Sequence, residues 1–272
     1  MALKIHSLNV RGLQNGLKRK MIFEWLKEKY NGITFLQETH STEKVESIWS
    51  KEWGGEILYS HGASNRAGVA ILIPSQLSDA ISINDFKSVI KGRILVLDAT
   101  IHGKKLLLIN VYAPTKDKAK EQLDFLNTLE ELVSEHADKS ILIGGDMNVC
   151  LEPEIDSDAK KTKASNYAIG VKVFLETYDL NDTWRLTYPD SRRYTWRNRS
   201  KHGFCQSRLD YFFCSNHLLY SFSKISINAS IKTDHSIVSM EFNMQNETEK
   251  KQAKKQYPKS MWETMCCMRS IR

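Results

Sequence analysis

The order of apolar and polar residues predicts many short strands separated by a few amphipathic helices. Apolar residues alternate with polar ones over 3–8, and they run almost without a break over 33–36 and 140–146. These patterns are typical of strands with one or both faces buried. Further strands are expected over 56–60, 68–73, 80–88, 93–101, 105–112, 193–197, 209–214, 222–228 and 236–242. Several of them follow each other directly, so we expect sheet layers of the α/β or α+β class and not a purely parallel, doubly wound sheet.

Helical periodicity occurs in four segments. Over 18–29 it places three large apolar side chains on one face, and over 117–136 it forms the longest amphipathic stretch of the chain. Shorter helices are expected over 43–51 and 165–176.

The expected strands and helices all lie within residues 1–244, which we interpret as one globular domain. Polar residues over 151–163 predict a loop inside it. Residues 245–272 lack strand periodicity and are rich in Lys, Gln and Glu, so we expect a basic, disordered tail or linker there.

The chain carries a net charge of +7, which favours a polyanionic partner. Part of this charge belongs to the end of the chain. Residues 243–272 contain seven Lys or Arg and three Glu, a charge of +4, which leaves +3 for residues 1–242. The body is therefore only mildly basic, and charge alone is weak evidence for a nucleic-acid partner.

Cysteine usage and hydropathy indicate where the protein works. The five cysteines have no C-x-x-C spacing, so a disulfide framework or a zinc site is not expected, and a reducing intracellular compartment is. No stretch approaches the roughly 20 apolar residues that span a bilayer. The first residues also lack the apolar core of a secretory signal.

Polar or acidic residues flank the expected strands at six places, where a sheet can bring side chains together. They are Asn9, Glu38, Tyr112, the pair Asp146 and Asn148, Asp210, and the pair Asp234 and His235. The most informative is Gly144–Asn148, where a buried strand runs into two glycines and then an acid and an amide. Any one place alone is more simply an exposed strand end. Six together favour a common site.

These residue types have a shared chemical logic. Carboxylates such as Glu38 could hold a hard divalent cation, which prefers oxygen ligands. The cation could polarise a phosphoryl oxygen, while Asp146 orients or deprotonates a water. His235 could stabilise the developing charge, with a nearby carboxylate fixing its tautomer. No phosphate-binding loop competes, because the glycines of Gly62–Gly68 have the wrong spacing.

Six ordered motifs identify a resemblance that covers residues 3–242. They are S-L-N-V-R-G-L from Ser7, L-Q-E-T-H from Leu36, N-V-Y-A-P from Asn110, G-G-D-M-N from Gly144, S-R-L-D-Y from Ser207 and T-D-H-S from Thr233. The chain resembles the endonuclease/exonuclease/phosphatase superfamily, which includes exonuclease III and apurinic endonucleases. Within it, the chain is most similar to the endonuclease domain of non-LTR retrotransposons. The resemblance implies a four-layered α/β/β/α sandwich of two mixed sheets, and Mg²⁺-dependent phosphodiester cleavage in which Mn²⁺ can substitute.

The resemblance also implies a role for each matching residue. Glu38 would be the main metal ligand, with Asn9 and Asp234 near the metal. Asp146 would orient or activate the attacking water, helped by Asn148.

On the phosphate side, the resemblance has Tyr112 contacting the scissile phosphate. Asp210 would pair with His235, which would stabilise the transition state. Thr195 and Ser207 match DNA-facing positions.

One position departs from the repair enzymes of the superfamily. Arg11 stands where exonuclease III and apurinic endonucleases carry Asp, so a carboxylate is missing from the metal vicinity. A second metal and efficient cleavage at abasic sites are therefore in doubt. Retrotransposon endonucleases also lack this Asp, which favours them as the closer relatives.

The segment 197–207 is expected to be a basic loop between two strands. Arg197, Arg199 and Lys201 suit phosphate contacts or insertion into a minor groove. An ordinary solvated hairpin tip explains the same charges equally well. Beside the site, strand alternation predicts that His40 points away from Glu38.

The leading hypothesis is a Mg²⁺-dependent endonuclease that nicks DNA, needs no small-molecule cofactor and works as a monomer in the nucleus. A repair nuclease of the exonuclease III type is the second hypothesis. A lipid or inositol phosphatase is the third, and an inactive DNA-binding remnant is the fourth.

Overall fold

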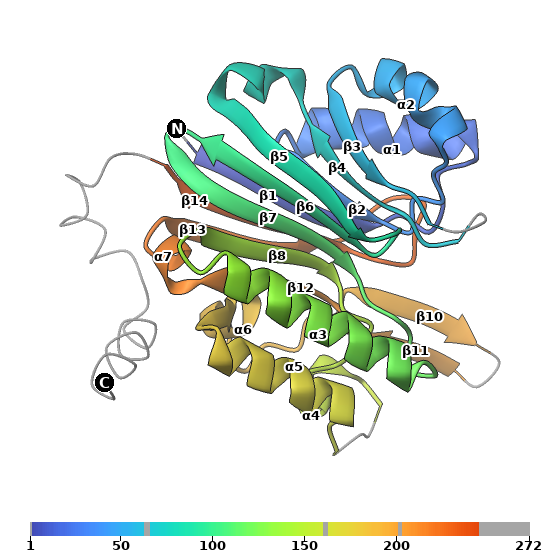
Figure 1. Cartoon of the computed structure of the whole chain (residues 1–272). Helices are drawn as coiled ribbons and strands as arrows, with labels where there is room; N and C mark the ends of the chain where they lie inside the picture. The colour runs from blue at the N-terminus through green and yellow to red at the C-terminus, as the bar shows by residue number, and fades with distance from the viewer. Residues whose placement is uncertain (1, 63–65, 160–162, 201–202, 245–272) are drawn as a thin grey trace.

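Two six-stranded mixed sheets pack face to face in this computed structural model, which describes residues 2–62, 66–159, 163–200 and 203–244 (Figure 1). The expected tail at 245–272 lies outside the described residues. The first sheet has the order β13-β14-β1-β2-β4-β3. Its strands are β13 (Phe222–Asn228), β14 (Ile237–Asn243), β1 (Ala2–Asn9), β2 (Ile33–Gln37), β4 (Val69–Ile73) and β3 (Glu56–Ser60). Only β1 and β2 are parallel among the pairs of this sheet.

The second sheet has the order β5-β6-β7-β8-β12-β9. Its strands are β5 (Ile81–Ile90), β6 (Ile94–Ile101), β7 (Lys104–Tyr112), β8 (Ser140–Asp146), β12 (Asp210–Ser215) and β9 (Leu180–Asp182). Here β7 and β8 are the parallel pair. Both sheets therefore have one parallel pair of strands, which end next to each other at one edge.

Helices cover the outer face of each sheet, which completes the four layers (Figure 1). On the first sheet, α1 (Gly16–Lys29) and α2 (Glu46–Trp53) bury an aromatic cluster with the strands. On the second sheet, α3 (Ala119–Glu135) and α5 (Asn166–Thr177) lie side by side. The predicted α/β/β/α sandwich is confirmed.

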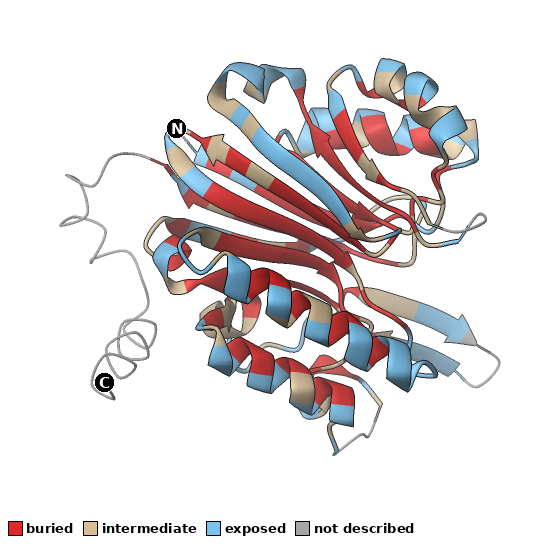
Figure 2. Ribbon diagram, viewed as in Figure 1, coloured by how far each residue is buried: buried red, intermediate tan, exposed pale blue. Residues whose placement is uncertain are grey.

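The alternation of side chains explains how one strand serves two layers. On β1, Leu3 and Ile5 join the core between the sheets, whereas Leu8 packs under the helices. Figure 2 shows the same division on the helices, whose inner faces are buried and outer faces exposed. None of the helices in the described ranges is both long and apolar enough to cross a membrane.

Most predicted elements are observed, and most of the differences lie between 150 and 219. The expected loop at 151–163 contains a short helix, α4 (Pro153–Asp156). The small elements β9, α6 (Thr183–Thr187) and α7 (Asn216–Leu219) were not predicted. The short 3-10 helices η1 (Glu43–Val45) and η2 (Ser75–Ala80) complete the set.

The segment 197–207 was expected as a basic loop linking strands at 193–197 and 209–214, and the structure places strands within it. This segment forms a hairpin of its own, β10 (Trp196–Ser200) and β11 (Gly203–Ser207), whose strands pair with each other and with neither sheet. The hairpin extends away from the body of the molecule (Figure 1). Its strands have few large apolar residues because both of its faces are largely exposed, so hydrophobic alternation gives no signal.

A buried polar clamp joins the two sheets behind the parallel strand ends. The side-chain nitrogen of Asn110, on β7, donates to the carbonyls of Leu36 at 3.0 Å and Ala70 at 2.8 Å in the opposite sheet. Its oxygen accepts a 2.8 Å hydrogen bond from Gln37, which also donates to Ser7 at 3.1 Å. All three side chains are fully buried, so water cannot replace these bonds.

Replacing Asn110 with Ala is expected to lower the free energy of unfolding by about 3 kcal/mol. It removes the acceptor of one Gln37 N–H and the side-chain donor to two carbonyls, and a buried group that loses its partner costs about 1–3 kcal/mol. Chemical denaturation measures the change, with Asn84→Ala on the exposed edge strand β5 as the matched control. A variant with wild-type stability would show that the clamp does not hold the sheets together.

Candidate active site

The parallel strands bring the predicted site residues to one edge of the sandwich. Asn9 ends β1, and Glu38 follows its parallel neighbour β2. On the opposite sheet, Tyr112 and Asp146 end the parallel strands β7 and β8 at matching register, and Asp210 begins β12 opposite Asp146. The site therefore lies across the seam between the sheets.

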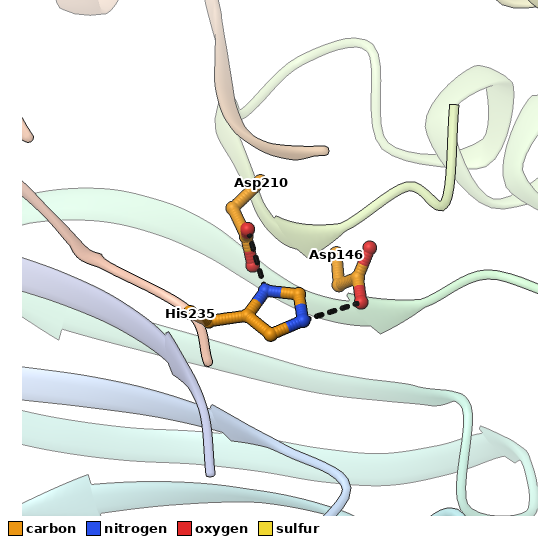
Figure 3. Close-up of side chains that lie close together, drawn as sticks. All are labelled: Asp146, Asp210 and His235. Carbon is orange, nitrogen blue, oxygen red and sulfur yellow. Dashed lines mark hydrogen bonds and ion pairs between the residues drawn. The ribbon is translucent and has the colours of Figure 1, made fainter. Parts of the chain in front are cut away.

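His235 lies between two aspartates at the centre of the site (Figure 3). Its Nδ1 donates to Asp210 Oδ2 at 2.8 Å, and its Nε2 lies 4.0 Å from Asp146 Oδ2. All three residues are buried. The bond to Asp210 fixes the proton on Nδ1 and turns Nε2 toward Asp146 and the cavity.

Burial and neighbouring charges shift the pKa values of His235 and Asp146. Burial lowers the pKa of His235, but the charge of Asp210 and the hydrogen bond donated to its carboxylate outweigh burial and raise this pKa to about 9. Burial, together with the charge of Asp210, raises the pKa of Asp146 to about 7. The imidazole is therefore cationic at neutral pH and can donate to an anion.

Asn9 links the carboxylates of the two sheets. Its side-chain nitrogen donates to Glu38 Oε1 and to Asp146 Oδ2, each at 2.9 Å, and its oxygen accepts from the backbone N–H of Arg11 at 3.0 Å. Asn148 holds the other oxygen of Asp146 through its backbone N–H at 2.8 Å. Asp146 is therefore fixed from both sides.

The end of β8 allows this close approach because the two residues before Asp146 in this strand are glycines, Gly144 and Gly145. Gly145 has φ of +144°, and a Cβ on it would lie 1.9 Å from the carbonyl oxygen of Val111. Only glycine fits between the parallel strands at this point. Asn148, two residues after Asp146, has φ of +51° and donates from its side chain to the carbonyl of Ala113 at 2.7 Å.

The carboxylates of the site fit a hard divalent cation, whereas the cationic ring of His235 has no lone pair to offer a metal. Ligand oxygens of Asp146 and Asp210 lie within 4.8 Å of each other and of a ring nitrogen of His235. Asp210 Oδ1 is buried with no hydrogen-bond partner, although a buried anionic oxygen normally has one. Carboxylate oxygens are the ligands that Mg²⁺ prefers, and Glu38 adds another through the bridge of Asn9.

Tyr112 remains a hydrogen-bond donor beside these acids. Burial raises the pKa of its hydroxyl, and the charges of Glu38 and Asp146 raise it further. The guanidinium of Arg93 lies over its ring, 5.3 Å from the centroid. The hydroxyl therefore stays protonated at neutral pH.

One predicted placement differs from the structure. His40 was expected to point away from Glu38, but its Nε2 lies 3.9 Å from Glu38 Oε2. The expectation was wrong because residues two apart in a strand share a face, and β2 in any case ends at Gln37, before two residues of positive φ. Asp234, predicted near the metal, lines the same cavity as Glu38, and its Oδ2 pairs with Arg11 Nη1 at 3.0 Å.

A cavity of about 570 Å³ opens above the acids. Glu38, Asp146 and His235 line its catalytic side, together with Tyr112 and Asn148. The hairpin contributes Trp196, Asn198 and Ser207 to its lining. The cavity therefore connects the acid cluster to the projecting hairpin.

The two faces of the hairpin carry different side chains. Residues 196 and 198 point toward the cavity, so alternation places Arg197 and Arg199 on the other face, where their partners across the ladder are Gln206 and Phe204. The bond from Arg197 Nε to Gln206 Oε1, 3.2 Å long, lies on that face. The predicted DNA-binding residues thus divide into an uncharged face toward the site and a basic face away from it.

Two other residues predicted to face DNA need separate descriptions. Thr195 is fully buried, and its hydroxyl accepts from the backbone N–H groups of Leu209 at 2.9 Å and Asp210 at 3.0 Å. In this structure it positions the start of β12. Lys201 lies outside the described residues.

A buried ionic network behind Asp210 was missed by the sequence analysis. Arg208, 1% exposed, donates to both oxygens of Asp156, at 2.7 and 3.1 Å, and pairs with Asp182 at 2.7 Å. Arg185 contacts Asp156 at 2.6 Å. The only signal was Arg208 itself, a charged residue directly before an apolar strand in S-R-L-D-Y. The network holds the segment that joins the hairpin to Asp210.

The geometry agrees with comparison to known proteins. The sequence profile described as "Endonuclease/Exonuclease/phosphatase family" matches residues 6–235, which include every acid and histidine of the central contact. The chain belongs to this family. The predicted resemblance is confirmed.

Two relatives and two solved structures define its place in the family. The chain is 31% identical over 242 residues to the "Transposon TX1 uncharacterized 149 kDa protein" of Xenopus laevis, covering 88% of this chain and 18% of that protein. It is 25% identical over 260 residues to an exodeoxyribonuclease of Bacillus subtilis, covering 89% of this chain and all of that protein. The fold is similar to an AP endonuclease of Leishmania major, with a TM-score of 0.76, 16% identity, and coverage of 89% and 88%. It is also similar to one of Archaeoglobus fulgidus, with a TM-score of 0.70, 24% identity, and coverage of 89% and 99%.

Replacing Asp156 with Asn is expected to lower the free energy of unfolding at pH 7 by about 3 kcal/mol, because it leaves a buried arginine with one partner fewer. Burial raises the pKa of Asp156, but the charge of Arg208 outweighs it, so this pKa lies below its usual range. A depressed folded pKa gives stability that is present above the unfolded value and lost as pH falls through the folded one. The difference between wild type and variant should therefore shrink below about pH 4.

Denaturation curves at pH 7, 5 and 3 measure this difference, with Asp138→Asn on the surface as the control. A stability difference that stays constant over this pH range would show that the charge of Asp156 is not what matters.

Proposed function

We propose that this protein is a Mg²⁺-dependent phosphodiesterase that nicks DNA. The observation that carries the proposal is the contact of His235 with Asp146 and Asp210 beside the Glu38–Asn9–Asp146 bridge. It combines a cationic donor, a carboxylate of raised pKa and additional oxygen ligands in one cavity. Membership of a family of nucleases and phosphatases supports the same chemistry.

Each residue then has a distinct task in hydrolysis. A divalent cation held by Glu38 and neighbouring carboxylates would stabilise charge on the phosphate and the leaving oxygen. Asp146 orients the attacking water and takes its proton, for which a pKa near 7 is well suited. His235 donates from Nε2 to a phosphate oxygen, and Asp210 keeps it charged and aligned. Tyr112 donates its hydroxyl to another phosphate oxygen.

A retrotransposon context is the second part of the proposal. The relative named as a transposon protein has higher identity than the exodeoxyribonuclease, and this chain spans about a fifth of its length. Arg11 in place of the repair enzymes' Asp supports target-site nicking over abasic-site repair. An exonuclease III-like repair nuclease remains the second candidate, since the bacterial relative matches along its full length.

Loss of Glu38, Asp146 or His235 should abolish nicking without unfolding the protein. We expect Glu38→Ala, Asp146→Ala and His235→Ala each to slow relaxation of supercoiled plasmid by on the order of 10²–10⁴. The assay uses Mg²⁺ and EDTA in parallel, and Glu28→Ala on the exposed face of α1 serves as the control.

The outcomes separate the candidate functions. Near wild-type nicking by His235→Ala would falsify the site assignment. A folded wild type that leaves plasmid intact but cleaves abasic duplex would support the repair nuclease. Hydrolysis of inositol phosphates alone would support the phosphatase, and DNA binding without any turnover would support the inactive remnant.

The two hairpin faces should have separable effects on nicking. Asn198→Ala on the cavity side is expected to change which positions are nicked, because it alters the surface next to the site. Arg199→Ala on the other face should weaken binding at every position alike. Sequencing of nick ends on one plasmid tests both, with Lys29→Ala as the control. An unchanged nick pattern in Asn198→Ala would remove the cavity face from target choice.

A further inference from the structure

We propose that the strand to be cut crosses the cavity with its flanking phosphates bound by two cationic rims, Arg11 on one sheet and Lys116 with Lys163 on the other. This inference rests on the proposed function and names the path of its substrate. The three side chains line the same cavity as the acids, and all three are exposed. The ligand class is therefore a phosphodiester backbone, bound on either side of the carboxylates that line the cavity, which we call the acidic floor.

The backbone of Arg11 is fixed so that its side chain reaches the cavity. Arg11 has φ of +46°, a conformation that a non-glycine residue adopts only where its surroundings impose it. Its N–H donates to Asn9 at 3.0 Å, and its carbonyl accepts from Lys18 Nζ at 2.9 Å. Lys18 also binds the carbonyl of Val10 at 2.7 Å. These bonds fix the loop that carries a side chain 68% exposed to solvent.

The ion pair of Arg11 with Asp234 is not needed to join its two loops. Thr233 Oγ1 donates to the carbonyl of Asn9 at 2.9 Å and already connects them. The pair is a single 3.0 Å contact with an exposed guanidinium, a type that contributes little to stability. A phosphate can bind a guanidinium in a bidentate way, so it can take the place of Asp234.

The opposite rim belongs to different elements. Lys116 lies between β7 and α3, and Lys163 lies two residues before Ser165, the N-cap of α5. Glu38 and Asp146 lie in the lining between the two rims. Because a nuclease must hold an anionic backbone over its own carboxylates, cations on both sides offset the repulsion of the floor.

The salt dependence of DNA binding tests the rims without catalysis. Binding of a fluorescent duplex is measured in EDTA across salt concentrations. We expect Arg11→Ala to weaken binding about tenfold and to reduce the slope of log K against log salt by about one. The pair Lys116→Ala and Lys163→Ala should reduce it by about two. Lys20→Ala and Lys172→Ala, on exposed helix faces, are matched controls that keep the wild-type slope.

A double-mutant cycle tests the exchange of partners. Asp234→Asn removes the charge that pairs with Arg11. It should tighten DNA binding more in the wild-type background than in Arg11→Ala, because only the wild type has a guanidinium that this substitution frees for a phosphate. Equal effects in both backgrounds would show that Asp234 acts only through general repulsion and would overturn the exchange. Wild-type slopes in both rim variants would overturn the path.

The location of the bound phosphates can be read from modified DNA. A single neutral methylphosphonate is placed next to a mapped nick, on the side that Arg11 is proposed to bind. It should weaken DNA binding by the wild type and have no further effect on binding by Arg11→Ala. A wild type that binds DNA but never nicks it would refute the proposed function, while the salt dependence of binding would still test the two rims. If the enzyme nicks DNA but the rim variants keep the wild-type salt dependence, the rims are refuted and the proposed function stands.

Discussion

Two carboxylates that belong to different sheets share the amide of Asn9, and the rest of the site depends on this contact. Glu38 and Asp146 repel each other, and both would move apart if the sheets separated at that edge. The clamp of Asn110 behind them prevents this because its bonds reach the backbone of the opposite sheet. A neutral amide can hold two like charges without cancelling either, so both remain available to a cation.

The site is also held from the side of β12. The buried pair of Arg208 and Asp156 fixes the segment before Asp210, and Thr195 binds the N–H groups that begin this strand. Asp210 then aligns His235. Inside the site, Asp210 Oδ1 is buried without a hydrogen-bond partner. An acceptor oxygen therefore stays open where a divalent cation would use it.

Apolar periodicity predicted the sheet layers, and the resemblance carried by the ordered motifs predicted the sandwich and its site. Periodicity could not place the strands of the hairpin, because they are exposed and lack it. Nor did it indicate the nearness of His40 to Glu38, two residues of positive φ beyond the end of β2. It named Asp234 and Arg11 separately but not their ion pair, because long-range pairing of exposed side chains has no local pattern. Arg208 stood inside a recognised motif, and only its burial revealed its role.

The separate ladder of β10 and β11 has a consequence for how such proteins diverge. Its strands pair only with each other, and single bridges from Trp196 to His235 and from Ser207 to Ser157 join it to the body. Substitutions in this ladder can therefore change the surface beside the cavity without moving the strand ends that carry the carboxylates. The surface offered to a substrate and the chemistry of the site are thus separable parts of one fold.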